Sequence, residues 1–304
     1  MIRVGITLGD PSGIGLEITR KALAHRTVRR ALTPIVFGDA SARIPGVELV
    51  AVTKLPAKLR APGKPSPAGG RAQLSYITAA IDSAKRGHLD ALCTAPVSKE
   101  AIASSGVPFT GHTELLAESF GCETMMLMKG PRLSVALATN HLPLAKVPGA
   151  LTKRLLVDKL VFLDRHLTPI VGKRPRIAVC GLNPHAGDGG VLGTEEKRFI
   201  APAIAAARAT GVDCHGPFAA DGLFASGRPF GFDVALAMFH DQGLVATKAV
   251  DFAHTVNVTL GLPVPRTSPD HGVAYDLAGK GRADPTPMIS ALLEAARQAR
   301  GRLG

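Results

Sequence analysis

The stretch IRVGITLGDPSGIGLEITRKAL, residues 2–23, decides the fold class of this chain. It begins with apolar residues typical of a buried strand, passes through a polar turn, and continues with apolar residues at helical spacing. The same order recurs at residues 89–106, 175–211 and 232–244. Strands that alternate with helices predict an α/β fold with mostly parallel sheets.

The composition is that of a globular protein with a large core. The chain has 304 residues, of which 46% are hydrophobic, and this length favours two lobes. No apolar run approaches the roughly 18 residues of a membrane helix, and the N-terminus does not read as a signal peptide. We therefore expect a cytoplasmic protein that does not enter membranes. Its four cysteines show no CxxC spacing and are expected to be reduced.

The net charge of +12 raises the question of nucleic-acid binding. Such binding needs clustered Lys and Arg, often with aromatic side chains on which bases stack. Here the basic residues are scattered, Trp is absent, and aromatic residues make up 4% of the chain. We therefore expect no nucleic-acid partner. A positive field would instead draw a small anionic substrate toward the protein.

Histidines follow three of the predicted strands. The run VALATNH ends at His141, IAVCGLNPH reaches His185, and VALAMFH ends at His240. Parallel strands present their carboxyl ends on one edge of the sheet, where ligands bind, so the three imidazoles could share one divalent cation. Three protein ligands and an open position are typical of a catalytic metal. The alternative is that each histidine forms a hydrogen bond that caps its own strand.

Other polar residues lie in similar places. His112 and Thr113 follow a glycine in GHTE, and Lys248, Asn257 and Arg266 come in a short span after the last histidine. Lys and Arg suit a phosphate or carboxylate, which Arg can bind with two parallel hydrogen bonds. Taken singly, each of these charges is equally compatible with a solvated surface.

The first turn, GDPSGIGLEI, has part of a dinucleotide-binding fingerprint. Gly13 and Gly15 follow a strand, and Asp39 closes the next strand at about the spacing of a ribose-binding acid. However, Ile18 replaces the third glycine, and Asp10 would repel a pyrophosphate. The turn is therefore a poor candidate for the cofactor site.

Nine segments, in order and over nearly the whole chain, resemble the 4-hydroxythreonine-4-phosphate dehydrogenase family. They are GDPSGIGLEI, TAPVSKEAI, GHTELLA, NHLPL, GLNPHAGDGG, GPFAADGLF, FHDQGL, VNVTLGLPVPRTSPDHG and DLAGKGRADP. The resemblance implies the fold of the isopropylmalate and isocitrate dehydrogenases, with two α/β/α lobes around a central cleft. Residues 1–118 with 262–304 would form the cofactor-side lobe, and residues 119–261 the metal-side and dimer-side lobe. The family works as a homodimer with its active site at the subunit interface.

The resemblance also implies a role for each candidate residue. His141, His185 and His240 would bind a divalent metal (Zn, Mg or Co), with ligands shared between partner chains. The phosphorylated substrate would be held by His112, Thr113, Lys248, Asn257 and Arg266. Apart from the resemblance, the position of Asp241 and Lys248 near these residues makes either one a candidate proton relay, and the sequence does not choose between them.

The segment HGVAYDLAGKGRADP, residues 271–285, is similar to the adenosine-binding loop of the isopropylmalate dehydrogenases. The resemblance assigns cofactor binding to His271, Gly272, Asp276 and Asp284. Asp276 falls where the NAD enzymes carry the aspartate that meets the adenosine ribose. An acid accepts hydrogen bonds from ribose hydroxyls and repels a 2'-phosphate, so NAD is expected rather than NADP.

The expected reaction is NAD-dependent, metal-assisted oxidation of 4-phosphooxy-L-threonine to a 3-oxo acid. That acid would decarboxylate to 3-amino-2-oxopropyl phosphate, in pyridoxal 5'-phosphate biosynthesis. A relative that oxidises D-threonate 4-phosphate, D-erythronate 4-phosphate or a carboxylated dihydrodiol is the alternative within the family. Two other classes stay open from the residues alone, namely a metal-dependent hydrolase or lyase and a ligand-binding protein without catalysis.

Overall fold

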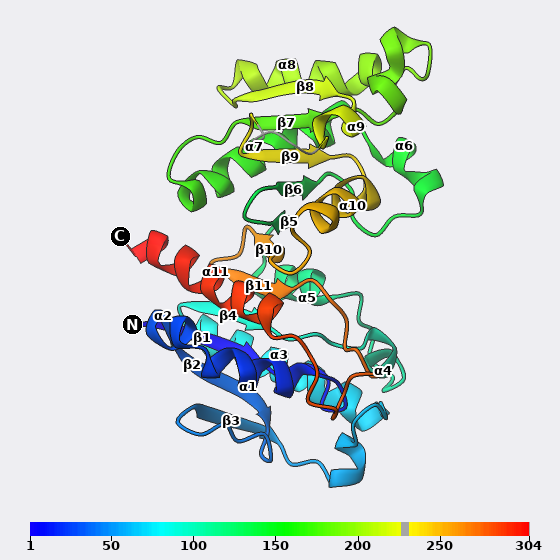
Figure 1. The fold of residues 1–304 in the computed structure, drawn as a ribbon. Coiled ribbons are helices and arrows are strands. Elements are labelled where there is room, and N and C mark those ends of the chain that lie inside the picture. The colour runs from blue at the N-terminus through cyan, green and yellow to red at the C-terminus, as the bar shows by residue number, and fades with distance from the viewer. Residues whose placement is uncertain (226–230, 304) are drawn as a thin grey trace. The chain divides into compact units, whose positions relative to one another are not determined.

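The computed structural model describes residues 1–225 and 231–303. The chain divides into two compact units, and Figure 1 shows their elements along the chain. Unit 1 comprises Met1–Thr124 and Val256–Gly304, and unit 2 comprises Met125–Thr255. Each unit contains its own set of strands and helices.

The strands of unit 1 follow one another in space in the order β3-β2-β1-β4-β11-β10. They are β1 (Ile2–Thr7), β2 (Leu32–Asp39), β3 (Glu48–Thr53), β4 (Ala91–Thr94), β10 (Val256–Leu260) and β11 (Arg266–Pro269). All neighbouring pairs are parallel except β10 and β11. The helical segments are α1 (Gly15–Ala24), α2 (Arg26–Ala31), η1 (Ala57–Arg60), α3 (Pro67–Lys85), α4 (Lys99–Ala103), α5 (His112–Phe120) and α11 (Thr286–Leu303).

Helices cover both faces of the sheet of unit 1 (Figure 1). Leu92 packs in one core with Tyr76 of α3. The next residue, Cys93, has its Sγ 3.9 Å from Sδ of Met288 in α11. Successive side chains of a strand point to opposite faces, so α3 and α11 lie on opposite sides of β4. Unit 1 is therefore a three-layer α/β/α arrangement.

The strands of unit 2 follow the order β5-β6-β9-β7-β8. They are β5 (Met125–Lys129), β6 (Ser134–Leu137), β7 (Ile177–Cys180), β8 (Cys214–Phe218) and β9 (Val234–Ala237). All neighbouring pairs are parallel except β5 and β6. The helical segments are η2 (Leu144–Lys146), α6 (Val147–Ala150), α7 (Lys153–Val171), η3 (Pro184–Gly190), η4 (Glu196–Ile200), α8 (Ala201–Ala209), α9 (Ala220–Leu223) and α10 (His240–Asp251).

Helix α10 lies very close to the sheet of unit 2 because it contains Gly243. A Cβ built on this glycine would be 2.8 Å from Cγ1 of Val135 and 3.0 Å from Cδ2 of Leu137, so a larger residue would push the helix away. The preceding strand β9 is fully buried. His240, the first residue of α10, is therefore held at the carboxyl end of β9 by both the strand and the packed helix.

The predicted α/β class with mostly parallel sheets is confirmed. The four cysteines, Cys93, Cys122, Cys180 and Cys214, are free as expected. Among the residues described, none of the helices has both the length and the apolar character needed to cross a membrane.

Candidate functional site

Arg266 is a buried cation in unit 1. Arg266 is the first residue of β11 and is 2% exposed. Nη1 donates to Oγ1 of Thr259 at 3.0 Å and Nη2 to Oγ1 of Thr94 at 2.6 Å, while Nε has no hydrogen-bond partner. Burial lowers the pKa of Arg266 to about 10. Within residues 1–225 and 231–303 no carboxylate forms an ion pair with it. An unpaired buried charge is costly, so this position suits an anionic ligand.

His112 lies beside this guanidinium at the start of α5. Its Nε2 is buried and has no hydrogen-bond partner. Burial, and then the positive charges of Arg266 and Lys99, hold the pKa of His112 well below its ordinary value. The imidazole is therefore neutral at pH 7. Thr113 follows as the second residue of the helix and is half-buried.

The register of β10 and β11 places Asn257 on the same face as Arg266. Asn257 is opposite Ser268, and Thr259 is opposite Arg266. Residues opposite each other in an antiparallel pair share a face, as do residues two apart on one strand. Oδ1 of Asn257 is buried and has no hydrogen-bond partner. Within the described part of the chain, His112, Asn257 and Arg266 thus each keep one buried polar atom unpaired. We call these three residues the anion cluster.

The fifth predicted substrate residue lies elsewhere. Lys248 is in unit 2, in the last turn of α10. The structure thus places four of the five residues in unit 1 and one in unit 2. Lys99, the first residue of α4, follows a strand in TAPVSK and is a polar candidate from sequence outside the five substrate residues. Its charge acts on His112, and only the folded chain reveals this proximity.

The depressed pKa of His112 predicts acid sensitivity. In the unfolded chain His112 would take up a proton below about pH 6.5, whereas the folded protein resists it. The contribution of His112 to the free energy of unfolding is therefore fully present above that pH. It is lost as the pH falls below it, by up to about 1.4 kcal/mol per pH unit. Urea denaturation of the wild type and His112→Gln from pH 7.5 to 5.5, in phosphate-free buffer, should show a flatter profile for the variant. Parallel profiles would contradict the depressed pKa.

Two of the three strand-end histidines come together in unit 2. The rings of His141 and His240 have centroids 5.6 Å apart. With a metal–nitrogen distance of about 2.1 Å, two imidazoles on one tetrahedral ion have centroids roughly 5 Å apart. Nδ1 of His240 is 2.7 Å from Oδ1 of Asp241, so Nε2 is the nitrogen that a metal ion would use. The pair therefore fits a divalent ion.

His185 does not complete this pair in the single chain. It lines a pocket of ≈ 610 Å³, and the two other histidines line one of ≈ 260 Å³. Both pockets share Leu144, Val147 and Phe239 in their walls, so they adjoin. Among the described residues, no three His, Cys, Asp or Glu side chains are grouped to hold a metal ion. Convergence of all three histidines stays a prediction.

The loop that carries His185 has an unusual backbone. Residues 185–189 all have positive φ, including the non-glycine residues His185 (53°), Ala186 (51°) and Asp188 (41°). Such conformations cost free energy and persist only where the surroundings hold them. The sequence GLNPHAGDGG suggested only a turn at this place.

Glu196 holds this loop and was missed by sequence reasoning. Its Oε1 accepts hydrogen bonds from the backbone N–H of Leu182 and of Asn183, both at 2.8 Å. Oε2 accepts from Nδ2 of Asn183 at 3.0 Å. Glu196 is 4% exposed and opens the π-helical turn η4, a feature often found at functional sites. The only available signal was an acid pair shortly after the loop.

In the predicted cofactor loop, residues 271–285 of unit 1, Asp276 is exposed. Within the described part of the chain its carboxylate makes no hydrogen bond or ion pair. A ribose could therefore use it. Asp284 is instead engaged, since its Oδ1 accepts from N and Oγ1 of Thr286 at the start of α11. Nδ1 of His271 is 3.0 Å from the oxygen of Gly272, and a Cβ built on Gly272 would meet only open space.

The first turn does not offer a phosphate site. The N–H of Ile14, which precedes α1, donates to the oxygen of Val273 at 3.1 Å, so the chain itself occupies the helix N-terminus. Asp10 is buried. The unfavourable reading of this turn from sequence agrees with the structure.

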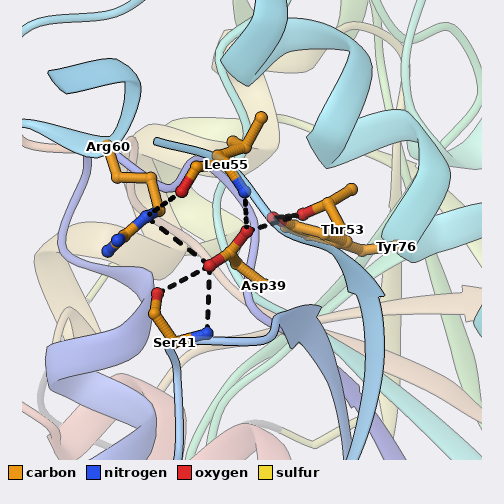
Figure 2. A network of polar contacts seen from close by, with 6 residues as sticks. All are labelled: Asp39, Ser41, Thr53, Leu55, Arg60 and Tyr76. Atoms are coloured by element: carbon orange, nitrogen blue, oxygen red, sulfur yellow. Dashed lines mark hydrogen bonds and ion pairs between the residues drawn. The ribbon is translucent and has the colours of Figure 1, made fainter. Parts of the chain in front are cut away.

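Asp39 forms the internal network of Figure 2. It accepts hydrogen bonds from N and Oγ of Ser41, Oγ1 of Thr53 and N of Leu55, and its Oδ1 is 3.5 Å from Nε of Arg60. Burial alone would raise the pKa of Asp39, but these hydrogen bonds outweigh it and the pKa lies below its ordinary value. With its lone pairs used internally, this carboxylate has no place for a ribose.

Comparison with known proteins decides the family. The family model described as pyridoxal phosphate biosynthetic protein PdxA matches residues 15–295. The chain belongs to the PdxA family. It is 46% identical to the 4-hydroxythreonine-4-phosphate dehydrogenase of Burkholderia vietnamiensis, and the match covers 99% of this chain and 98% of that protein. The predicted family, and the oxidoreductase class predicted with it, are confirmed.

Two solved structures of dehydrogenases that are more than 30% identical to this chain have the same fold. The 4-hydroxythreonine-4-phosphate dehydrogenase of Klebsiella pneumoniae matches with a TM-score of 0.87 and 33% identity, covering 98% of this chain and 100% of that one. A terephthalate 1,2-cis-dihydrodiol dehydrogenase from Burkholderia xenovorans matches with a TM-score of 0.68 and 31% identity, covering 97% and 98%.

The predicted fold relationship also extends beyond the PdxA family. An isocitrate dehydrogenase from Methylococcus capsulatus matches with a TM-score of 0.53 and 15% identity, covering 100% of this chain and 86% of that one. A match at this low sequence identity is evidence of a shared fold and not of a shared function. It agrees with the predicted isopropylmalate and isocitrate dehydrogenase-like architecture.

Proposed function

We propose that this chain catalyses the NAD-dependent, divalent-metal-assisted oxidation of 4-phosphooxy-L-threonine. The product is a 3-oxo acid that decarboxylates to 3-amino-2-oxopropyl phosphate, in pyridoxal 5'-phosphate biosynthesis. The observation that carries the substrate class is the buried Arg266, which forms no ion pair within 4.0 Å among the described residues and lies beside His112. A phosphate supplies the missing negative charge.

The anion cluster binds the phosphate end of the substrate. Arg266 donates its free Nε–H to a phosphate oxygen, and the neutral imidazole of His112 donates or accepts one hydrogen bond at Nε2. Asn257 and Thr113 add neutral polar groups, and the family resemblance adds Lys248 as a further substrate residue. Placing the phosphate among these residues fixes the position of the carbon that is oxidised.

The histidines of unit 2 bind the divalent metal. His141 and His240 form the pair that fits an ion, and His185 is the third ligand of the proposal. When bound, a divalent ion supplies Lewis acidity that lowers the pKa of a hydroxyl, as it brings a water from ~16 to ~7. Oδ1 of Asp241 accepts a hydrogen bond from Nδ1–H of His240, and this tautomer leaves Nε2 to bind the metal. This contact favours an orienting role for Asp241 and leaves the proton relay to Lys248.

The exposed carboxylate of Asp276 accepts hydrogen bonds from the adenosine ribose of NAD. When bound, the nicotinamide would supply the acceptor for the hydride of the substrate carbon, and Lys248 would take up the hydroxyl proton. The resulting 3-oxo acid loses carbon dioxide readily, because the electrons of the broken bond move into the neighbouring carbonyl. Unit 1 is thus the cofactor side and unit 2 the metal side of the enzyme.

The Asp276→Lys variant should exchange the cofactor preference. A lysine removes the ribose acceptor and attracts a 2'-phosphate, so the ratio of kcat/KM for NAD over NADP should fall by at least about tenfold. Initial rates with both cofactors test this. Lys280→Asp, also exposed in the same loop, is the control for a change of charge alone. An unchanged ratio in Asp276→Lys would refute the assignment.

A homodimer is part of the proposal. Large apolar side chains of unit 2 are exposed in the single chain, and they support a subunit interface. They include Leu144 (66%), Val191 (81%) and Val245 (68%). Light scattering on the purified protein measures the oligomeric state. A monomer at micromolar concentration would remove the dimer from the proposal.

A second candidate function is oxidation of a carboxylated dihydrodiol. The similarity to the dihydrodiol dehydrogenase from Burkholderia xenovorans favours it, since a carboxylate could occupy the anion cluster in place of a phosphate. Oxidation of D-threonate 4-phosphate or D-erythronate 4-phosphate is the third alternative within the family.

One absorbance experiment separates these functions. Reduced nicotinamide is followed with NAD, a divalent metal and a panel that contains 4-phosphooxy-L-threonine, both sugar-acid phosphates and a carboxylated dihydrodiol. The proposal expects the highest kcat/KM with 4-phosphooxy-L-threonine. A higher value with another substrate would reassign the function. Saturable phosphate binding without any reduction of NAD would favour a metal-dependent hydrolase or lyase, or a binding protein.

A further inference from the structure

Three groups of contacts anchor the cofactor loop, residues 271–285, to the N-terminal segment of unit 1. The oxygen of Val273 accepts from N of Ile14 at 3.1 Å, and the hydroxyl of Tyr275 donates to Oδ2 of Asp10 at 2.7 Å. Farther along, N of Ala283 donates to Oε1 of Glu17 at 2.9 Å. The loop is thus attached at both of its ends to the first turn and the first helix.

Asp10 is buried at the centre of these contacts. It is 2% exposed, and its Oδ1 accepts from N of Ser12 at 2.7 Å. Its Oδ2 accepts from Nε2 of Gln73 at 2.7 Å as well as from Tyr275. Among the residues described, no cation forms an ion pair with Asp10. Burying a carboxylate among neutral donors costs free energy of folding, so a role in packing alone does not explain why Asp10 is an acid.

Tyr275 is a donor over the whole physiological pH range. Burial raises the pKa of its hydroxyl, and the Asp10 carboxylate raises it further. The proton therefore stays on the tyrosine, and the contact is a charge-assisted hydrogen bond rather than a shared proton. Gln73 in turn accepts from N of Ser98 at 2.8 Å, which fixes the amide group that donates to Asp10.

Between the two anchored residues lies a strained one. Ala274 has a φ of 45°, a left-handed conformation that costs an alanine roughly 1–2 kcal/mol. The backbone also passes close to the first turn, since a Cβ built on Gly13 would be 3.0 Å from the oxygen of Val273. Without the contacts of Val273 and Tyr275 the backbone would relax out of this conformation. Asp276 is the next residue, so its position depends on the same contacts.

We propose that Asp10, acting through Tyr275, is a positioning residue that orders the loop bearing Asp276 for the nicotinamide cofactor. The inference rests on the proposed function, in which NAD binds at this loop. The first turn, which resembles a dinucleotide fingerprint, thus serves the cofactor indirectly: it holds the binding loop and contacts no phosphate. Pre-ordering lowers the entropy lost when the cofactor binds.

The test measures the Kd of NAD by calorimetry for Tyr275→Phe and Asp10→Asn. Tyr275→Phe keeps the ring and removes the hydrogen bond, and its Kd for NAD should rise about tenfold. The Kd of inorganic phosphate at the anion cluster should stay within about twofold. In kinetics the KM for NAD should rise while kcat at saturating NAD is retained.

Tyr76→Phe is the matched control. It removes the chain's other tyrosine hydroxyl, which is 2.9 Å from Oγ1 of Thr53 in the network around Asp39 (Figure 2). This variant should lose stability but keep the wild-type Kd for NAD. If Tyr76→Phe weakened NAD binding as much as Tyr275→Phe, the effect would be general destabilisation and the proposal would be overturned.

A double-mutant cycle tests whether the two residues act together. If Asp10 acts through Tyr275, the double variant should bind NAD no more weakly than the weaker single variant. Additive losses, or a wild-type Kd in the folded single variants, would overturn the inference. The proposed function fails differently: the wild type would then bind no NAD, or Asp276→Lys would leave the preference for NAD unchanged.

Discussion

Replacement of His240 by alanine is expected to leave less than about a thousandth of the wild-type kcat. The reason is the size of the metal's contribution: bringing a hydroxyl pKa from ~16 toward ~7 is worth up to ~12 kcal/mol at ~1.36 kcal/mol per unit. A positioned base alone gives only ~100 to 10,000-fold. Calorimetry should show loss of divalent-ion binding in the same variant. The Kd for inorganic phosphate should stay near the wild-type value, because the anion cluster belongs to unit 1.

His88→Ala is the control for this variant, since His88 is exposed and belongs to unit 1, whereas the strand-end histidines belong to unit 2. It should retain full activity and metal binding. Substantial turnover by His240→Ala in metal-free buffer would rule out the metal role. His141→Ala should behave as His240→Ala does, because their rings are neighbours.

Arg266→Met is expected to lower the activity without lowering the stability of the protein. The substitution removes an unpaired buried charge and keeps a similar volume, so the free energy of unfolding in phosphate-free buffer should be unchanged or up to about 4 kcal/mol higher. The kcat/KM should nevertheless fall by about 100- to 3,000-fold, because the substrate phosphate loses its buried cation. Urea denaturation and initial rates measure the two effects. The wild type should also gain stability with added inorganic phosphate, and the variant should not.

Arg297→Met is the matched control, since Nη2 of Arg297 is paired with Oε1 of Glu294 at 2.6 Å and its side chain is 46% exposed. It should keep full activity. A strong loss of stability in Arg266→Met would mean that the guanidinium supports the fold through Thr94 and Thr259, and the substrate proposal would then lose its main observation.

The strand-end histidines could be predicted from sequence more fully than the state of the charged residues could. Strand-end positions such as His141 and His240 follow from local patterns, because a parallel sheet brings the ends of its strands to one edge. His185 was assigned by the same rule, yet its loop continues through a left-handed turn, and in the single chain it lines an adjoining pocket. Local periodicity carries no information about such a turn.

The roles of Arg266, Asp39 and Asp276 depend on burial and on hydrogen-bond partners, which the sequence does not show. Nothing in the letters around Arg266 distinguishes a solvated surface charge from a buried one, and only the packed strands show that it is 2% exposed. Asp39 and Asp276 both looked like ribose-binding acids in sequence. The structure gives Asp39 a full set of internal donors and leaves Asp276 without a partner among the described residues.

By itself the sequence determined the α/β class, the strand-end histidines and the family, because these depend on residue spacing and on motifs that are continuous in the chain. Only the tertiary structure decided which polar atoms are unpaired and which residues hold a functional loop. Asp10 and Tyr275, for example, are 265 positions apart in the chain. The free energy of such a contact depends on burial and on the competing partners, and both exist only once the chain is folded.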